Sequence, residues 1–450
     1  MSEPIISVSG LRGTIGDQLT PAVAMRYVSA LAATLPPGKV VIGRDGRASG
    51  PLLAQVVSAT LQGHGLDVVD LGPAATPTIG VEVRNCKAVA GIQISASHNP
   101  VAYNGLKLFG PAGRVLPKTD GEQVLEAYKQ QKTKWVPVEG LGSAADAEHP
   151  HSAHLAAVHG VVEVDSIREK KFKVLLDSNH GAGAALGRLL LESFGCEVTV
   201  LGEEPHGQFA HKPEPLAENL QGVSEQVAAG GYDVVFCQDP DADRLAIIDE
   251  KGAFIGEELT LALCLLDLIA ARKAKGLPTG NFITNCATSS VSKVLAEQSG
   301  YTHKQSAVGE ANVADLMIAE DACFGGEGNG GPIDPEVGYV RDSFVGMARA
   351  LSLLARTGKT VSALVAELPK YSMVKDKVDL AGVELPVLLD KLESAFGDAH
   401  ASRPDGLKLQ WEDRWLLVRG SNTEPIVRFI AEAPSTEEAQ ALCDRARASL

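Results

Sequence analysis

The chain has 450 residues, of which 45% are hydrophobic and 22% are charged, and its 41 basic and 56 acidic residues give a net charge of −15. At about 100 to 200 residues per domain, this length predicts three or four domains. An acidic chain without a basic run is not expected to bind nucleic acid or an anionic membrane. The sequence shows neither an apolar stretch of bilayer length nor a secretory signal core, so we expect a cytoplasmic protein.

Three stretches share a pattern of a short β-rich run, a polar turn, an amphipathic helix, a glycine and a second β-rich run. They begin near Val40, Val174 and Phe282, more than one hundred residues apart. Each predicts a βαβ unit, in which the two strands are parallel by default. We therefore expect three similar α/β domains rather than a solenoid, with one large doubly wound sheet as the alternative.

Polar and C-terminal segments suggest where these domains end. The stretch around residues 141 to 153 resembles a domain boundary or the start of an interdomain helix. The last 80 or so residues become β-rich, with two or three strands expected over 407–433 and a closing amphipathic helix after them. The expected organisation is therefore α/β domains at 1–150, 151–252 and 253–368, followed by an α+β domain at 369–450.

The segment GIQISASHNPVAYNGLKLFG, residues 91–110, predicts a loop that presents side chains. Pro100 stops a helix and biases the preceding residue toward extended geometry, so Ser97 and His98 should lie on an exposed, tightly turned loop. Ser97 is favoured over Ser95 because it adjoins His98 at the turn. The alternative is a hydroxyl that caps a helix.

Two glycine-rich loops earlier in the chain, SGLRGTIG and IGRDGRASG, carry Arg12, Arg44 and Arg47. Solvated surface arginines are the usual case for such loops. In a chain of this acidity, however, arginines grouped on loops beside the serine turn suggest an anion nearby.

The segment YDVVFCQDPDADRLAIID places Asp239, Asp241 and Asp243 at alternate positions between two apolar runs. Alternate residues of an extended segment point the same way, so the three carboxylates could converge. Converging carboxylates repel one another unless a cation lies among them, and a hard ion such as Mg²⁺ is the natural occupant. The alternative is an acidic turn open to solvent.

Two later loops carry groups that could bind ligand hydroxyls and a phosphate. GGEGNGG, residues 325–331, lets the backbone approach a ligand and offers Glu327 and Asn329 to hydroxyls, with a flexible hairpin turn as the alternative. RGSNTEP, residues 419–425, supplies hydroxyls, backbone amides and a guanidinium to a dianionic phosphate, although a Ser-Asn-Thr turn between strands is more often only a turn. The candidate phosphate-binding residues are Arg419, Ser421, Asn422, Thr423 and Arg428.

A serine on a rigid loop, a cluster of three aspartates and several arginine loops together favour phosphoryl transfer. In that chemistry the serine carries the phosphoryl group, a metal ion offsets its charge, and a lysine or histidine handles protons. Lys107, in the sequence NGLK ten residues after Ser97, is the lysine best placed along the chain.

With these motifs in order, the chain resembles the α-D-phosphohexomutase family, which includes phosphoglucomutase, phosphomannomutase and phosphoglucosamine mutase. The resemblance covers essentially the whole chain and rests on SGLRG, SASHNP with NGLK, DPDADR, GGEGNGG and RGSNTEP, in that order. HGQFAHKPEPLAENL is also similar to the family's segment ahead of the metal loop. The motifs are most similar to those of archaeal-type phosphoglucosamine mutases.

The resemblance implies a heart-shaped arrangement of four domains, with three similar mixed α/β/α sandwiches and a C-terminal α+β domain around a central cleft. It implies an enzyme that interconverts hexose 1-phosphate and 6-phosphate through a phosphoserine and a bisphosphorylated sugar. Mg²⁺ would be the cofactor and a hexose 1,6-bisphosphate the activator. The expected partner is a small sugar phosphate, and the expected state is a monomer or homodimer.

The resemblance also assigns roles to individual residues. Ser97 would be phosphorylated, and its phosphate would complete the Mg²⁺ site formed by Asp239, Asp241 and Asp243. Lys107 matches the general acid/base, with His98 and Arg12 close to the transferring group and Arg244 beside the metal. Glu327 and Asn329 would contact the sugar. The distant phosphate would be held by Arg419, Ser421, Asn422, Thr423 and Arg428.

Two differences from the family bear on the substrate and the metal. Members that act on glucose or mannose phosphates commonly have serine two places after the sugar-loop glutamate, whereas this chain has Asn329, so we expect glucosamine phosphate. A phosphomannomutase/phosphoglucomutase of broad specificity is the alternative. Many members have glycine in place of Pro240 or Ala242, but this difference leaves the three aspartates unchanged.

Two other classes of function compete with a mutase. A non-catalytic sugar-phosphate binding protein would be favoured by loss of the serine, a metal aspartate or the lysine, and the chain retains all of them. A P-loop kinase is disfavoured because GxxxxGK[ST] is absent from the sequence, although this does not exclude every phosphatase.

Overall fold

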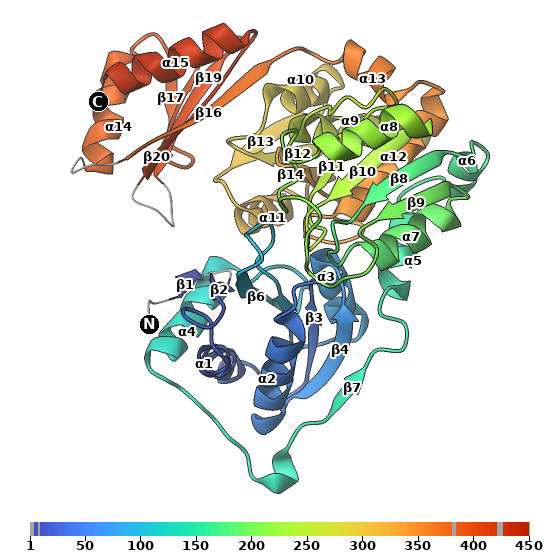
Figure 1. Ribbon diagram of the computed structural model, residues 1–450. Coiled ribbons are helices and arrows are strands. Elements are labelled where there is room, and N and C mark those ends of the chain that lie inside the picture. The colour runs from blue at the N-terminus through green and yellow to red at the C-terminus, as the bar shows by residue number, and fades with distance from the viewer. Residues whose placement is uncertain (1–3, 8–9, 380–383, 421–425, 450) are drawn as a thin grey trace.

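The computed structural model describes residues 4–7, 10–379, 384–420 and 426–449. The chain forms three successive α/β units and a C-terminal α+β domain, as the sequence predicts. In Figure 1 the first domain, in blue, and the C-terminal domain, in red, lie on opposite sides of an opening, and the second and third domains pack together beside them. Within the described ranges, no helix is long and apolar enough to cross a membrane.

The three predicted βαβ units are confirmed, and their strand pairs are parallel. They lie in three different sheets, so the alternative of one large doubly wound sheet is wrong. The units are β3 (Lys39–Arg44), α2 (Gly50–Gly63) and β4 (Asp67–Pro73); β8 (Lys173–Asp177), α7 (Ala184–Ser193) and β9 (Glu197–Leu201); and β12 (Asn281–Asn285), α10 (Ser290–Gln298) and β13 (Thr302–Ser306).

The sheet of the first domain has the strand order β1-β2-β6-β5-β3-β4-β7 and mixes parallel with antiparallel pairs. The segment expected as a boundary adds the edge strand β7 to this sheet before the chain enters the second domain. The other elements are β1 (Ile5–Ser7), β2 (Gly10–Thr14), α1 (Pro21–Ala32), α3 (Thr76–Asn85), β5 (Ala90–Ile94), β6 (Tyr103–Phe109), α4 (Lys118–Lys129), the 3-10 turn η1 (Val138–Gly140) and β7 (Ala144–Asp146).

The second and third domains have sheets ordered β11-β10-β8-β9 and β13-β12-β14-β15. One apolar cluster runs through both, joining Phe236 of the second domain to Phe282 and Phe344 of the third, so these domains share a core. Their remaining elements are α5 (Ser152–Gly160), α6 (Val164–Arg168), α8 (Gln221–Gly230), β10 (Val234–Gln238), β11 (Leu245–Ile248), α9 (Glu257–Ala274), α11 (Glu310–Ala319), β14 (Phe324–Glu327), β15 (Gly331–Ile333), α12 (Ser343–Thr357) and α13 (Val361–Glu367).

The C-terminal domain has a core of its own and docks on the third domain through polar contacts and a small apolar cluster of Cys286, Trp415 and Leu417. Glu432 accepts the backbone N–H of Ser290 at the start of α10, and Lys408 donates to the Cys286 carbonyl at 2.7 Å. Its antiparallel sheet has the order β16-β20-β19-β18-β17. The elements are β16 (Ser372–Asp379), α14 (Leu385–Ala395), β17 (His400–Ser402), β18 (Leu407–Gln410), β19 (Trp415–Gly420), β20 (Ile426–Ala433) and α15 (Thr436–Ala448).

The buried ammonium of Lys408 should make the stability of this docking depend on pH. Burial lowers the pKa of Lys408 from 10.5 to about 8. The unfolded chain therefore holds more protons than the folded chain between these values, and the free energy of unfolding contributed by this group rises with pH across that window. Between about pH 8 and about pH 10, we expect the Tm of the wild type to rise relative to that of Lys408→Met. Parallel pH profiles of Tm would contradict this assignment.

Candidate active site

Ser97 lies in the loop between β5 and β6, in the left-handed region at φ 49°. Its backbone N–H donates to Ser95 Oγ at 2.9 Å, and Ser95 Oγ in turn donates to Asp45 Oδ2 at 2.6 Å. The prediction of an exposed loop is wrong for Ser97, which is buried because the loop after β10 packs against it. Ser95 thus supports the loop, and Ser97 is the hydroxyl that faces the second domain.

The side chain of Arg47 stabilises the serine loop by hydrogen bonds to its backbone carbonyls. Its fully buried guanidinium forms an ion pair with Asp45 at 3.0 Å and lies 5.1 Å from the ring of Phe209. The anion beside Arg47 is therefore the Asp45 carboxylate and not a ligand, because the other donors of Arg47 are taken by the loop backbone. The carbonyls that accept from it, at 2.6 to 2.9 Å, belong to Ser97, Asn99, Pro100 and Tyr103.

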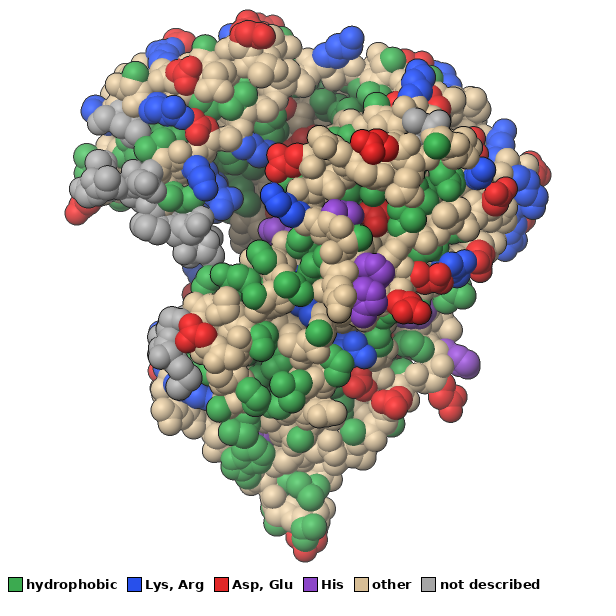
Figure 2. All heavy atoms as spheres, viewed as in Figure 1, with side chains coloured by type: hydrophobic (Ala, Val, Ile, Leu, Met, Phe, Trp, Pro, Cys, Tyr) green, Lys and Arg blue, Asp and Glu red, His purple; other side chains and the backbone are tan. Residues whose placement is uncertain are grey.

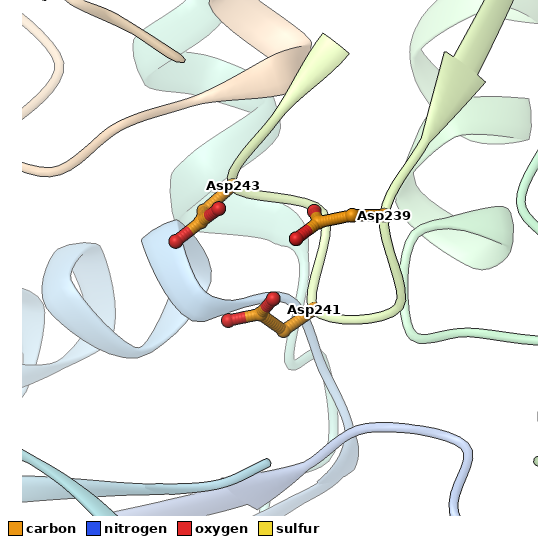
Figure 3. Close-up of side chains that lie close together, drawn as sticks. All are labelled: Asp239, Asp241 and Asp243. Carbon is orange, nitrogen blue, oxygen red and sulfur yellow. The ribbon is translucent and has the colours of Figure 1, made fainter. Parts of the chain in front are cut away.

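The three aspartates converge in the turn between the antiparallel strands β10 and β11 (Figure 3). One carboxylate oxygen from each of Asp239, Asp241 and Asp243 lies within 4.8 Å of the others, and all three residues are buried. The alternative of a solvent-open acidic turn is thus wrong. The predicted reason for the convergence is also wrong, because the segment is not extended: it folds back at Ala242, which has φ 55°.

The carboxylate cluster fits a hard divalent cation. Among the described residues, Asp241 Oδ1 and Asp243 Oδ1 are buried without a hydrogen-bond partner. Burial and repulsion from these two neighbours raise the pKa of Asp239 well above its ordinary value. Because Mg²⁺ prefers carboxylate oxygens and would offset this repulsion, Asp239, Asp241 and Asp243 fit as its ligands.

The serine loop and the metal loop meet directly across the first and second domains. Ser97 Oγ donates to Asp239 Oδ2 at 3.0 Å. At the start of α3, Thr76 Oγ1 donates to Asp241 Oδ2 at 2.5 Å, and the Thr76 backbone N–H donates to the Asp241 carbonyl. The nucleophile predicted in one domain and the metal ligands predicted in another therefore belong to one site.

Lys107, from β6, points into the same cluster. Its Nζ lies 3.0 Å from Asp243 Oδ2, 3.6 Å from Asp241 Oδ2 and 3.7 Å from Glu310 Oε2. Burial lowers the pKa of Lys107, but these carboxylates outweigh burial and leave the pKa above its ordinary value. Lys107 is therefore held as a charged ammonium beside the metal ligands.

His98, Arg12 and Arg244 are brought to the same region. His98 Nδ1 lies 3.3 Å from Ser97 Oγ, and burial together with the charges of Arg244 and Arg12 lowers the pKa of His98, so the imidazole is neutral. Burial also lowers the pKa of Arg12, while Asp241 and Asp243 oppose that shift. The Arg244 backbone N–H donates to Asp239 Oδ1 at 3.1 Å.

Two charged residues of the site, Arg341 and Glu310, were missed by sequence reasoning. Arg341 links the metal loop to the sugar loop, because it donates to Asp243 Oδ2 at 2.6 Å and to Glu327 Oε2 at 2.8 Å. Glu310 Oε1 accepts the backbone N–H of Arg341 at 2.8 Å. Arg341 lies just before α12 and Glu310 is the first residue of α11, and neither belongs to a motif identified in the sequence.

The sugar loop is the turn of the hairpin β14–β15, and Glu327 is buried at its start. Glu327 Oε1 accepts from Asn285 Nδ2 at 2.7 Å and from the Gly309 N–H at 3.0 Å. Asn329 Nδ2 lies 3.4 Å from Glu327 Oε2, and Asn329 Oδ1 has no hydrogen-bond partner in the described part of the chain. The hairpin is therefore firmly packed, and Asn329 Oδ1 is a buried polar atom without a hydrogen-bond partner among the described residues.

The predicted phosphate loop is described only at its edges, because Ser421, Asn422 and Thr423 lie outside the described residues. Arg419 on β19 donates to Asp405 Oδ2 at 2.8 Å, and it lies opposite the exposed Arg428 on β20. Figure 2 shows the molecule hollowed between the C-terminal and first domains, with Lys, Arg and His side chains along the edges of the hollow. The two arginines thus lie on adjacent strands, in a domain separate from the serine and metal loops.

Family models match this architecture from end to end. The phosphoglucomutase/phosphomannomutase α/β/α domains I, II and III match residues 5–135, 150–252 and 258–371, and the C-terminal domain of the same family matches residues 371–449. The chain belongs to the α-D-phosphohexomutase family. The predicted four-domain fold and the predicted class of enzyme are thereby confirmed.

Individual relatives agree with this membership. The chain is 35% identical over 441 residues to a "Phosphoglucomutase/phosphomannomutase" of Thermococcus kodakarensis, covering 96% of this chain and 95% of the relative. It is 33% identical to a "Probable phosphoglucosamine mutase" of Methanopyrus kandleri, covering 97% and 95%. A phosphoglucomutase/phosphomannomutase family protein of Burkholderia thailandensis superposes with a TM-score of 0.84 at 25% identity, covering 99% and 98%.

Removing one carboxylate of the cluster should weaken divalent-cation binding. We expect Asp241→Asn to lower Mg²⁺ affinity by more than the roughly 10- to 100-fold lost when an outer-shell partner is removed. Isothermal titration calorimetry with Mg²⁺ and Mn²⁺ would measure the change. The matched control is Asp249→Asn, a buried aspartate that accepts from the Lys251 and Ala253 backbone N–H groups and should keep wild-type affinity. Equal affinity in both variants would show that the cluster is not the metal site.

Replacing the guanidinium of Arg47 should make the serine loop more mobile. Lysine keeps the charge of Arg47 but cannot reach the same set of carbonyls, so we expect Arg47→Lys to lower kcat by about 10- to 100-fold. Hydrogen exchange at the amides of residues 95–103 should accelerate in the variant. Arg44→Lys, at the end of β3 three residues before Arg47, is the control and should leave both measurements unchanged. Unaltered exchange in Arg47→Lys would refute the positioning role.

Proposed function

We propose that this phosphohexomutase works through a phosphoserine at Ser97, with a bisphosphorylated sugar as its intermediate. The observation that carries the proposal is the 3.0 Å contact between Ser97 Oγ and Asp239 Oδ2, which places a hydroxyl nucleophile at the edge of the carboxylate cluster. A phosphoryl group on Ser97 would therefore lie beside Asp239, Asp241 and Asp243. Mg²⁺ bound by these aspartates would supply neutralisation of the phosphoryl charge.

The chain's own residues account for the proton transfers. When a sugar hydroxyl attacks the phosphorus of phosphoserine, the phosphorus–Oγ bond breaks, the hydroxyl loses a proton, and Ser97 Oγ gains one. Lys107 Nζ, held as an ammonium, can donate the proton, and neutral His98, with Nδ1 3.3 Å from Ser97 Oγ, can accept one. In the second half of the cycle the other phosphate returns to Ser97 by the same exchange.

The positively charged side chains around Ser97 would stabilise the negative charge of the transferred phosphoryl group. Arg12 and Arg244 lie on the serine side of the cluster, and Arg341 joins it to the sugar loop. A bisphosphorylated sugar must also be held by its second phosphate. Arg419 and Arg428, on adjacent strands, are the described candidates for that contact, together with the predicted loop at 421–425.

For the sugar, we propose glucosamine phosphate as the preferred substrate. The sugar loop offers the unpartnered Oδ1 of Asn329, and Glu310 Oε2 lies 3.7 Å from Lys107 Nζ and 4.0 Å from Arg341 Nε, beyond hydrogen-bond distance of both. A carboxylate oxygen in this position can accept from an amino group on the sugar. Several archaeal relatives carry the name "Probable phosphoglucosamine mutase", whereas the relative from T. kodakarensis described above carries a phosphoglucomutase/phosphomannomutase name, so broad specificity is the second candidate.

A hexose 1,6-bisphosphate is the proposed activator, since it would place a phosphoryl group on Ser97 and restart the cycle. An N-acetylphosphoglucosamine mutase variant from Aspergillus fumigatus, which shares the fold at a TM-score of 0.62 and 15% identity, was solved in complex with glucose 1,6-bisphosphate. The proposed partner is thus a small sugar phosphate, and we propose a monomer or homodimer as the active form.

Removing the nucleophile should abolish turnover and keep the fold. We expect Ser97→Ala to lose mutase activity by roughly 10³-fold or more. Its Tm should stay close to that of the wild type, because the change removes one hydroxyl. Wild-type protein incubated with radiolabelled glucose 1,6-bisphosphate should retain the label, and Ser97→Ala should not. Wild-type turnover by Ser97→Ala would remove Ser97 from the mechanism.

The sugar preference can be tested with three substrates side by side. We expect the Mg²⁺-loaded enzyme, primed with a hexose bisphosphate, to turn over glucosamine 6-phosphate with a higher kcat/KM than glucose 1-phosphate or mannose 1-phosphate. Asn329→Ser should narrow that difference. Comparable rates on all three substrates would establish a broad phosphohexomutase and overturn the proposed role of Asn329. Release of inorganic phosphate in place of isomerisation would indicate a phosphatase.

A further inference from the structure

One buried histidine outside the active site connects three domains. His154 lies in α5 of the second domain and is fully buried. Its Nδ1 lies 2.9 Å from Oγ1 of Thr78, in helix α3 of the first domain. Its Nε2 lies 2.7 Å from Oδ2 of Asp342, which caps helix α12 of the third domain.

The partners of the imidazole determine where its proton lies. A carboxylate only accepts, so Nε2 carries the proton that is donated to Asp342, and Nδ1 accepts from the Thr78 hydroxyl. Asp342 is itself fixed, because its Oδ1 accepts from the backbone N–H groups of Phe344 and Val345. The imidazole therefore joins helices α3, α5 and α12 through two directional hydrogen bonds.

The two residues adjacent to Asp342 in the sequence, Arg341 and Ser343, both contact the active site. Arg341 donates to Asp243 and Glu327, which belong to the metal loop and the sugar loop. Ser343 Oγ donates to the Ala242 carbonyl in the metal loop at 2.7 Å. A shift of Asp342 would therefore move both contacts together.

On the Thr78 side, the same helix reaches the metal loop from the first domain. Thr76, two residues earlier in α3, donates to Asp241 through both its hydroxyl and its backbone N–H. The first domain also carries Ser97 and Lys107. His154 thus connects the domain that holds the nucleophile with the segment that holds Arg341.

We propose that His154 is a positioning residue that sets the serine-bearing first domain against the metal loop and Arg341. The proposal rests on phosphoryl transfer at Ser97, the function proposed above. Such a transfer requires the reacting atoms to be aligned, and a misplacement of about 1 Å can cost about 10²-fold in rate. His154 acts through Asp342 and Thr78 and touches neither the substrate nor the metal ligands.

A histidine on the same helix provides the comparison. His159 also lies in α5, but its Nε2 bonds to Ser193 Oγ within the second domain, and its ring packs on Phe194. These contacts do not join the second domain to any other domain. His159→Gln should therefore alter the stability of the second domain without altering kcat.

Two amides separate the two hydrogen bonds of His154. The amide of glutamine can take the place of Nε2 and donate to Asp342, whereas the shorter amide of asparagine can take the place of Nδ1 and reach Thr78. We expect His154→Gln and His154→Asn each to lower kcat by about 10- to 100-fold, because each keeps only one of the two hydrogen bonds that join the domains. The KM for the sugar phosphate should change by less than about 3-fold in both, because alignment rather than ground-state binding is lost.

The variant Thr78→Val and a hydrogen-exchange measurement distinguish a loss of domain positioning from misfolding. Thr78→Val removes the hydroxyl that serves the first domain and keeps the shape of the side chain, so it should lower kcat without a large change in KM. Hydrogen exchange at the amides of Phe344, Val345 and Arg244 should accelerate in His154→Asn and stay near wild type in His154→Gln. This readout requires neither a substrate nor a metal ion.

The outcomes separate this proposal from the proposed function. Wild-type kcat in either amide variant, or wild-type exchange in His154→Asn, would overturn the positioning role even if Ser97→Ala is inactive. Loss of activity accompanied by the same fall in Tm in both amide variants would show a purely structural histidine. If Ser97→Ala retains turnover but the exchange pattern differs between the two amides, the proposed mechanism fails and the link between the three domains stands.

Discussion

Repulsion among three buried carboxylates is the constraint on which the rest of the active site depends. Asp239, Asp241 and Asp243 lie within a few ångströms of one another and away from water, so their charges must be offset by positive groups. Every cationic element described at the site approaches this cluster: Lys107 from the first domain, Arg244 beside the cluster itself and Arg341 from the third domain. Electrostatic attraction between the carboxylate cluster and cationic side chains of three domains is consistent with a site at the junction of those domains.

The contacts between the domains differ in a way that bears on the geometry of this site. The second and third domains share one apolar core, so the metal loop and the sugar loop are held in a fixed relation. The first and C-terminal domains have larger cores of their own, and Thr76, Thr78, Lys408 and Glu432 connect them to the rest through hydrogen bonds. Apolar contacts add to both interfaces, with Val81 on the first-domain side and Trp415 on the C-terminal side. Interfaces that mix polar and apolar contacts allow domains to move relative to one another, which suits an enzyme whose proposed intermediate must turn over while bound.

Local backbone strain at the two central loops has a common origin. Ser97 and Ala242 both have positive φ, although neither is glycine. Such a conformation persists only where the surroundings enforce it. Around Ser97 the enforcement comes from the guanidinium of Arg47 and the hydroxyl of Ser95, and around Ala242 it comes from the hydroxyl of Ser343. Each loop is thus held in place partly by a buried polar group from another segment, Arg47 for the serine loop and Ser343 for the metal loop.

The amino-acid sequence by itself determined the three βαβ units, the separate C-terminal domain and the motifs of the site, because these depend on local periodicity and on short runs of residues. It also predicted that three aspartates converge, although for the wrong reason, since the turn at Ala242 depends on packing against Ser343. Only the tertiary structure decided which distant charges join the cluster. Arg341, Glu310 and His154 belong to none of the motifs identified in the sequence, and Arg47 differs from a surface arginine only in the residues that pack over it. Their roles arise from contacts between residues far apart in the chain, and the sequence gives no local signal for such contacts.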